Sequence, residues 1–297
     1  MIITRLSGGI GNQLFQYALG RNLSFKNKTE LKIEISDFDD SKNPRIYKLD
    51  TFNVSAVLAN KKDFKKTGLP NMKNKNFLNR IIRKILRIFD GRKPIYKRKF
   101  VIEPYFQFCP DILKIDASCY LSGVWQSEKY FKDIEKVMRK EFTLKNKPSV
   151  GAENWIGKVR ECDSVSIHIR RGDYVNSQKT NQFHGVCSLE YYNEAIALIV
   201  QKIANPVFFV FSDDIAWARA NLKTRYSIEY VSDKKIPDYE ELIIMSRCKH
   251  NILANSSFSW WGAWLNENPD KIVIAPKKWF AENIDTKDLI PPSWVRL

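Results

Sequence analysis

The sequence has little of what marks several large classes of protein. It holds only three histidines, at positions 168, 184 and 250, and their spacing is not that of zinc ligands. It has no run of about 18 apolar residues, the length that crosses a bilayer. Its N-terminus, MIITRLSGGIGNQ, lacks the basic lead and long apolar stretch of a secretory signal. These absences argue against a zinc enzyme, a transmembrane protein and an exported one.

Paired cysteines are also missing. The five cysteines form no C-x-x-C motif, and an odd number cannot close completely into intramolecular disulfides. We therefore expect a cytoplasmic protein with reduced thiols. Hydrophobic residues make up 44% of the 297-residue chain and aromatic residues 13%, which is enough for a packed core. The length favours two domains.

Negative charge is scarce in one segment of the chain. Residues 61–100 contain 15 Lys or Arg against Asp63 and Asp90, which gives this segment +13 of the total net charge of +16. The rest of the chain is close to neutral, so the basic character does not describe the whole surface. An anionic partner local to this segment is implied.

Part of this basic segment has the pattern of an amphipathic helix, with apolar residues at three- and four-residue spacing and basic residues on the other side. The apolar set is Phe77, Leu78, Ile81, Ile82, Ile85, Leu86 and Phe89, and the basic set is Arg80, Arg83, Lys84 and Arg87. A solvated surface helix and attachment to an anionic membrane, at its inner face, both fit this pattern. Aromatic side chains are too sparse to favour single-stranded nucleic acid, so no nucleic-acid partner is expected.

Strand and helix patterns alternate in two parts of the chain. Residues 1–35 predict a strand, a glycine-rich turn, a helix and a second strand. A second series begins at Ser164, with strand-like segments starting at residues 165, 207, 227, 250 and 271 and helical patterns between them. This alternation predicts an α/β fold with parallel, doubly wound sheets. We place the domain boundary near residue 150, which gives domains of 1–150 and 151–297.

The strongest motif is VSIHIRRGDY, in which a buried apolar strand runs into two arginines and an aspartate. Ligands of open α/β sheets bind at the carboxyl ends of strands, and guanidinium groups suit bidentate capture of phosphate or carboxylate. An anionic ligand is one interpretation of Arg170 and Arg171. The other is that they point to opposite faces and one pairs with Asp173. We expect both to hold in part, with one arginine for the ligand and one for support.

The second motif is SGGIGNQ, directly after the first expected strand. Glycines at such a turn permit positive φ and close approach of a ligand. The motif matches a dinucleotide fingerprint only loosely, because Leu14 stands where the third glycine belongs. Asn12 and Gln13 offer amides that can bind hydroxyl groups or phosphate oxygens.

Two further strands end in polar residues. Asn255, Ser256 and Ser257 can cap the following helix, whose free N–H groups form an anion site. Three tryptophans in that helix, at positions 260, 261 and 264, are expected in the core rather than as sugar platforms. Asp213 and Asp214 suit either Mg²⁺ or a helix cap, and we favour the cap.

These pieces, in this order, resemble the family of α-1,2-fucosyltransferases (glycosyltransferase family eleven), especially its bacterial members. The matching stretches are GGIGNQLFQYALGRNL, HIRRGDY and NSSFSWWGAWLN, spread over almost the entire chain. The resemblance implies a GT-B architecture, two Rossmann-like domains facing across a cleft. It also implies GDP-β-L-fucose as donor and inversion to an α linkage. More distantly, His-x-Arg-Arg-x-Asp is similar to a motif of α-1,6-fucosyltransferases, and Gly-x-x-Gly-Asn-Gln to one of protein O-fucosyltransferases.

The resemblance also implies roles for individual residues. Arg170 would contact the diphosphate, His168 would lie near the guanine or ribose, and Asn12 would sit at the reaction centre. The residues expected to bind the donor are His168, Arg170, Arg171, Gly9, Gly11, Asn255, Ser256 and Ser257. Catalysis is expected from Arg170, Asn12 and Asp173, although Asp173 also suits positioning an arginine, and Gln13 is expected to contact the acceptor.

The resemblance thus implies an inverting transferase that moves L-fucose to the 2-hydroxyl of a terminal galactose, in O-antigen or other polysaccharide biosynthesis. Fixed positive charge from Arg170 at the leaving diphosphate would replace a catalytic metal, so no metal or other cofactor is expected. The domain 1–150 would take the acceptor, which could be lipid-linked, and 151–297 the donor. The alternatives are a non-catalytic nucleotide-sugar or glycan-binding protein and an RNA-binding protein that uses residues 61–100.

Overall fold

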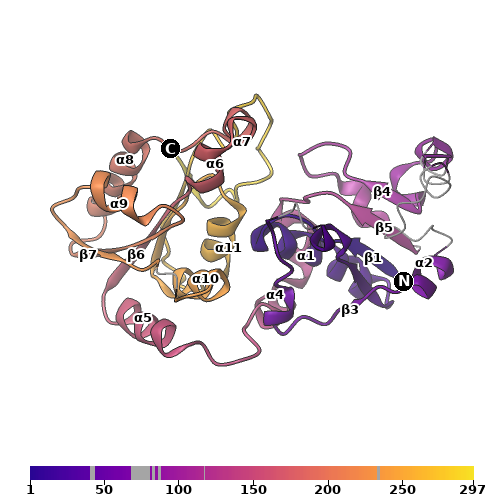
Figure 1. Ribbon diagram of the computed structural model, residues 1–297, viewed down its shortest axis with the longest axis horizontal. Helices are drawn as coiled ribbons and strands as arrows, with labels where there is room; N and C mark the ends of the chain where they lie inside the picture. The colour runs from indigo at the N-terminus through magenta and orange to yellow at the C-terminus, as the bar shows by residue number, and fades with distance from the viewer. Residues whose placement is uncertain (41–43, 68–80, 82–83, 86–87, 117, 233–234) are drawn as a thin grey trace. The chain divides into compact units, whose positions relative to one another are not determined.

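The computed structural model describes residues 1–40, 44–67, 81, 84–85, 88–116, 118–232 and 235–297. The chain divides into two compact units (Figure 1). Unit 1 comprises Met1–Lys145 with Lys287–Leu289, and unit 2 comprises Asn146–Thr286 with Ile290–Leu297. Each unit is built on one parallel β-sheet.

Unit 1 holds a five-stranded sheet in the order β3-β2-β1-β5-β4. Its strands are β1 (Ile2–Arg5), β2 (Leu31–Glu34), β3 (Val57–Leu58), β4 (Phe100–Ile102) and β5 (Cys119–Ser122), and its helices are α1 (Ile10–Lys26), α2 (Lys61–Lys66) and α4 (Glu135–Glu141). Helix α1 is buried around most of its circumference, from Ile10 to Leu23 with few interruptions. A helix buried in this way lies in the centre of its unit, where it fixes the turn that follows β1.

Unit 2 holds a six-stranded sheet in the order β11-β10-β9-β6-β7-β8. Its strands are β6 (Asp163–Ile169), β7 (Pro206–Ser212), β8 (Ser227–Tyr230), β9 (His250–Ile252), β10 (Val273–Ala275) and β11 (Val295–Arg296). Its helices are α5 (Val150–Arg160), α6 (Gly172–Asn176), α7 (Gln178–His184), α8 (Leu189–Val200), α9 (Ile215–Asn221), α10 (Asp238–Arg247) and α11 (Ser257–Leu265).

Both faces of the unit 2 sheet are covered, which explains why its strands are apolar without alternation. Val165 and Val210 face α8 and α9, while Phe209 and Phe211 face α5 and α10 on the other side. Strands β9, β6 and β7 lie in the middle of the sheet. Because all three run parallel, the loops that follow them emerge at one edge.

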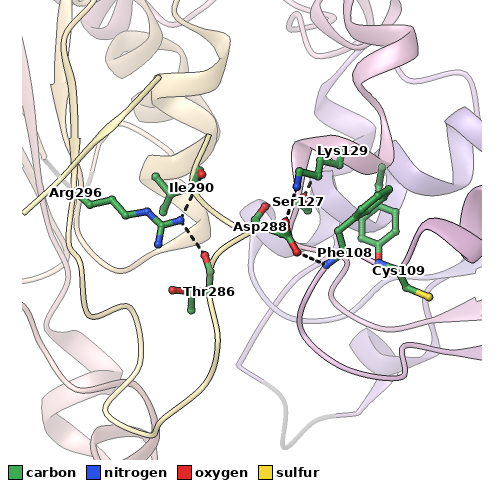
Figure 2. Close-up of polar contacts among 9 residues, drawn as sticks. Phe108, Cys109, Ser127, Lys129, Thr286, Asp288, Ile290 and Arg296 are labelled. Carbon is green, nitrogen blue, oxygen red and sulfur yellow. Dashed lines mark hydrogen bonds and ion pairs between the residues drawn. The ribbon is translucent and has the colours of Figure 1, made fainter. Parts of the chain in front are cut away.

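The chain passes into unit 1 once more near its C-terminus, at Lys287–Leu289. Figure 2 shows how Asp288 is held there: its carboxylate accepts hydrogen bonds from the backbone N–H of Phe108 at 3.1 Å and the ammonium of Lys129 at 2.5 Å. Its carbonyl oxygen accepts from the hydroxyl of Ser127 at 2.7 Å. The sequence prediction had assigned all of 151–297 to the second domain, and it missed this short return because a three-residue segment has no periodic pattern.

The two parallel-sheet units confirm the predicted α/β fold with two domains. The structure divides the chain between Lys145 and Asn146, whereas the sequence placed the boundary near residue 150. Of the expected amphipathic helix, most residues between 77 and 87 lie outside the described residues. Within the part that is described, Ile81, Ile85 and Phe89 are exposed. No helix among the described residues is long and apolar enough to cross a membrane.

Candidate active site

The carboxyl edge of the unit 2 sheet brings together the motifs that follow β6, β7 and β9. Arg170 and Arg171 come directly after β6, Asp213 and Asp214 after β7, and Asn255 shortly after β9. These strands are hydrogen-bonded neighbours, so segments separated by up to about 85 residues meet at one edge. The sequence prediction placed each of them at a strand end, and the sheet order joins them.

Arg170 is held between two carboxylates. Its guanidinium pairs with Asp173 and lies 2.9 Å from Asp213 Oδ2. The ring of Tyr174 lies beneath it, 5.4 Å from the guanidinium carbon. The Arg170 side chain keeps 20% of its accessible surface, so the planar group is both fixed and reachable. A guanidinium oriented in this way is suited to binding a planar or tetrahedral anion.

Arg171 is turned toward a different helix. Its guanidinium stacks on Trp217 of α9 at 4.0 Å and lies 3.3 Å from Asp214 Oδ2. Asp214 also caps α9 by accepting the N–H of Trp217 at 3.1 Å, which is the role expected from the sequence. We had expected one of the two arginines to pair inside the domain, and in the structure both do.

Asp213 supports the turn that carries both arginines. Its Oδ1 accepts the backbone N–H of Arg171 at 2.8 Å, and its Oδ2 pairs with Arg170. A Cβ atom on Gly172 would lie 2.5 Å from Asp213 Oδ2, so a larger residue would displace this carboxylate from its partners. No local pattern indicates this role of Asp213, because an aspartate that caps a helix and one that pairs with a guanidinium have the same sequence context.

His168 is buried at the end of β6. Its ring lies 5.3 Å from that of Phe258, and its Nδ1 has no hydrogen-bond partner. Burial, together with the charge of Arg170, lowers its pKa from 6.5 to about 3. His168 is therefore neutral at physiological pH, and its Nδ1 is a buried hydrogen-bonding atom without a partner.

The segment after β9 is more structural than the sequence suggested. The side-chain amide of Asn255 donates to the carbonyl oxygens of His184 at 2.9 Å and Trp279 at 3.1 Å, so it ties two loops together. Ser256 caps α11 by accepting the N–H of Phe258, as expected. Ser257 begins α11 and is partly exposed. The three tryptophans of this helix are buried, which confirms that they belong to the core.

A pocket of 480 Å³ lies beside this segment in unit 2. It is lined by residues 277–284 and Thr286. Its wall is joined to the β9 loop through the Asn255–Trp279 hydrogen bond and to α7 through the hydrogen bond from Ala281 N–H to Phe183. Among the residues that the structure describes, no group of three or more His, Cys, Asp or Glu is placed to hold a metal ion.

The carboxyl edge of the unit 1 sheet carries the second motif. Gly8 takes the positive φ of +73° that the turn after β1 requires, and a Cβ there would lie 2.7 Å from Asn12 Nδ2. Gly9 is the N-cap of α1 and Gly11 lies inside that helix, with no positive φ at either. Asn12 accepts a hydrogen bond at 2.8 Å from the side-chain amide of Gln126, which follows β5.

Gln13 does not have the environment of an acceptor-binding residue. It is fully buried, and its amide donates to the carbonyl oxygens of Gly8 at 3.1 Å and Ile46 at 2.8 Å. Its Oε1 accepts the N–H of Lys48 at 3.0 Å. The side chain thus fastens the 46–48 segment to the turn after β1, and we leave it out of the proposed site.

One carboxylate at this edge was not anticipated. Glu103 follows β4 directly, and its oxygens accept the backbone N–H groups of Val124 at 2.6 Å and Trp125 at 3.0 Å. Burial raises its pKa to about 7, although the two amides act in the opposite direction. The sequence around Glu103 has no recognisable motif, so only the fold shows that it lies on the same edge as Asn12.

Comparison with known proteins gives a consistent family. The whole chain, residues 1–297, matches the model of Glycosyl transferase family 11. The α-1,2-colitosyltransferase of Escherichia coli is 33% identical over 303 residues, which cover 100% of this chain and 99% of that protein. The O-antigen biosynthesis glycosyltransferase WbnK of Escherichia coli is 32% identical over 332 residues, 98% and 99% of the two chains. Galactoside alpha-(1,2)-fucosyltransferase 1 of Homo sapiens is 24% identical over 188 residues, 59% of this chain and 51% of that protein. The chain belongs to glycosyl transferase family 11.

Proposed function

We propose that this protein transfers L-fucose from GDP-β-L-fucose to the 2-hydroxyl of a terminal galactose, with inversion at the fucose C1. The observation that carries the proposal is Arg170, fixed at the carboxyl end of β6 between Asp173 and Asp213 and still accessible. It is supported by membership of family 11 and by the likeness to α-1,2-transferases of fucose and colitose.

The chemistry accounts for the need for a fixed cation. As the bond between fucose C1 and the phosphate oxygen breaks, its electron pair stays on GDP and the sugar gains oxocarbenium character. A guanidinium held by Asp173 and Asp213 does not have to reorganise during this step, so it stabilises the developing charge at little cost.

Other donor-side residues have narrower proposed roles. His168 would offer its neutral ring to the nucleoside, since its Nδ1 has no partner within the protein. Ser256 and Ser257 stand at the N-terminus of α11, where the positive end of the helix dipole favours a phosphate. Asn255 would act by shaping the loops that it joins, and Arg171 by holding the turn through Asp214 and Trp217.

A second donor is favoured by one specific observation, the 33% identity with an α-1,2-colitosyltransferase over the whole chain. Colitose differs from fucose in lacking the 3-hydroxyl group, so a site for one sugar can be tested directly against the other. A site that hydrogen-bonds the 3-hydroxyl rejects the deoxy sugar by a large factor, because its buried polar groups lose their partner. Fucose is the donor that we propose, and colitose is the alternative donor against which it is tested.

The experiment measures GDP release in the presence of EDTA. The intact protein is incubated with GDP-fucose or GDP-colitose and a panel of β-galactosides, including lipid-linked ones. Release that depends on both GDP-fucose and a galactoside, with a product whose new linkage is α-1,2, supports the proposal. Faster release from GDP-colitose assigns the other donor. Binding of GDP-fucose in titration without turnover on any galactoside would identify a non-catalytic sugar-nucleotide-binding protein instead.

We also propose attachment to an anionic membrane surface through the basic segment. Within its described part, Ile81, Ile85, Ile88 and Phe89 are 40–61% exposed, at the spacing of one helix face. An apolar stripe in a segment of charge +13 is the arrangement that lies in a membrane interface. Co-sedimentation with anionic vesicles tests it. Ile85→Glu with Phe89→Glu should abolish binding, while Val150→Glu, at a 75% exposed apolar residue in unit 2, should not.

A further inference from the structure

Glu103 has more hydrogen-bonding capacity than its contacts within the protein use. It follows β4, and its backbone N–H donates to Ser122 at 2.9 Å, which continues the pairing of β4 with β5. A carboxylate offers roughly four lone-pair sites, and the N–H groups of Val124 and Trp125 take two of them. The residue is only partly exposed. It is therefore oriented by the backbone and able to accept a further hydrogen bond.

The loop that binds Glu103 is strained. Trp125 has a φ of +54°, a region that a bulky residue rarely adopts, and its buried ring leaves Nε1 without a partner. A Cβ atom on Gly123 would lie 2.5 Å from the Cβ of Glu103, so the loop closes on this side chain as tightly as the chain allows. Strain of this kind persists where the surrounding structure imposes it, and it is concentrated at functional sites.

The same loop reaches Asn12 on its other side. Gln126 donates to Asn12 Oδ1 at 2.8 Å, and Gln16 of α1 donates to the carbonyl oxygen of Gly123 at 3.0 Å. Strand β5 lies between β1 and β4 in the sheet. With neighbouring strands about 4.8 Å apart, the carboxyl ends of β1 and β4 lie about 10 Å from each other along this edge.

The electrostatic surroundings of Glu103 suit proton transfer. Burial raises its pKa to about 7, where a carboxylate is a much stronger base than in water. Among the described residues, the phenol of Tyr130, which packs against Trp125, is a titratable group whose pKa is raised by the charge of Glu103. Burial also raises the pKa of Tyr130, so this phenol stays neutral over the working range.

We propose that Glu103 is the catalytic residue that takes the proton from the attacking hydroxyl group of the acceptor. The proposal rests on the function proposed above. The acceptor oxygen forms its bond to fucose C1 while its proton passes to the Glu103 carboxylate, and the electron pair of the broken C1–O bond leaves with GDP. Asp173, the carboxylate that the sequence suggested, is paired with Arg170, which suits it to positioning that arginine.

The test compares Glu103→Gln with wild type over pH 5.5–9, using the full chain and saturating GDP-fucose. In the wild type, kcat/KM for the acceptor should fall as the pH drops through about 7, because the protonated carboxyl cannot accept a proton. In Glu103→Gln we expect a loss of roughly 10²–10⁴-fold at pH 8 and no inflection near pH 7. The dissociation constant for GDP-fucose should stay within about threefold of the wild-type value, because Glu103 is proposed to act in the transition state and not in donor binding.

The matched control is Glu34→Gln, at a buried carboxylate of the same unit that accepts the N–H of Ser36 at 2.7 Å and the hydroxyl of Tyr120 at 3.0 Å. It should lower stability and leave the inflection in place. If Glu103→Gln keeps the inflection at a uniformly reduced rate, Glu103 only holds the loop and the proposal is overturned. If wild type transfers no fucose to any galactoside, the proposed function fails instead, which separates the two conclusions.

A second variant covers the case in which Glu103→Gln fails to fold. Glu103→Asp keeps a carboxyl group but withdraws it from the amides of Val124 and Trp125, so its pKa must change. A displaced inflection in the pH profile of Glu103→Asp supports the assignment. An inflection at the wild-type position shows that another group titrates and overturns it.

Discussion

The carboxyl edges of the two sheets occupy the same place in similar folds, but one carries mainly charged side chains and the other mainly neutral amides. In unit 2 the edge is built from ion pairs, with Arg170 and Arg171 set among three aspartates. In unit 1 it is built from a hydrogen-bonded pair of amides, Asn12 and Gln126, and from one carboxylate, Glu103, that accepts two backbone N–H groups. Fixed charges suit an anionic leaving group, and neutral hydrogen-bonding groups suit a hydroxyl. The comparison shows that similar sheets place their loops at the same edge, while the residues in those loops decide which chemical groups each edge presents.

This comparison predicts that charge changes at the unit 2 edge act on the donor. Arg170→Ala should reduce kcat/KM by roughly 10²–10³-fold, as removal of one preorganised donor to a transition-state anion does. It should also weaken binding of GDP, since the ground-state diphosphate meets the same group. Arg170→Lys keeps the charge without the planar fork and should recover only part of the loss. Steady-state kinetics and GDP titration measure both effects.

The control for Arg170→Ala is Arg219→Ala on α9. The guanidinium of Arg219 packs on the ring of Tyr230, at 4.3 Å. Within the described part of the chain it forms no ion pair with Asp173 or Asp213. It should leave kinetics and GDP affinity unchanged. Equal activity of Arg170→Ala and Arg219→Ala would break the comparison, because the charged edge would then have no part in donor chemistry.

Acid sensitivity should belong to unit 2, which contains all three histidines. His168 binds a proton near pH 6.5 when unfolded but stays neutral to about pH 3 when folded. Its contribution to stability is therefore complete above pH 6.5 and is lost as the pH falls from 6.5 toward 3. Between pH 7 and 5, wild type should lose about 2 kcal/mol more than His168→Gln.

Urea unfolding followed by tryptophan fluorescence reports this change, because seven of the eight tryptophans lie in unit 2. His184 and His250, whose pKa values are also lowered by burial, are common to both proteins and cancel in the difference. Parallel pH profiles for the two proteins would show that His168 is protonated in the folded state, and its neutral role would fall.

The two aspartates after β7 have different roles: Asp213 pairs with Arg170, and Asp214 caps α9. Substitutions at each test these roles separately. Asp213→Asn places an amide donor against the guanidinium, and we expect kcat/KM to fall about tenfold, or 1.4 kcal/mol. Asp214→Asn keeps a good helix cap and should change kcat/KM less than about twofold. Similar losses in both would mean that the turn responds as a whole and that Asp213 has no separate role.

The sequence predicted the parallel strands, the helix that follows β1 and the residues at the ends of β6, β7 and β9, because period and apolar runs are local properties. It could not show that Arg170 lies between Asp173 and Asp213, since Asp213 comes 43 residues after Arg170 in the chain. Nor could it separate Gln13, which is buried, from Asn12 beside it. Which face a residue takes within a helix turn depends on what packs against that turn.

Glu103 shows the same limit more sharply. It follows a three-residue strand in a part of the chain without strong periodicity, and its partners lie more than 20 residues away. Burial and two backbone donors decide its pKa, and neither is encoded by its neighbours in sequence. Only the order of the strands in unit 1 shows that Glu103 lies on the same edge as Asn12.

The smallest expected effect tests the glycine turn of unit 1. Gly8→Ala forces a side chain onto a φ of +73° and against Asn12 at 2.7 Å, so stability should fall by about 1–2 kcal/mol. Gly9→Ser is the matched change, because Gly9 has a φ of −73° and open space for a Cβ, and serine is a good N-cap. Thermal unfolding should show a loss for the first and none for the second. If Gly9→Ser keeps its stability but loses activity, a ligand approaches the backbone at Gly9. The turn after β1 would then bind substrate directly instead of only orienting Asn12, and the unit 1 edge would resemble a binding loop more closely than its hydrogen bonds now indicate.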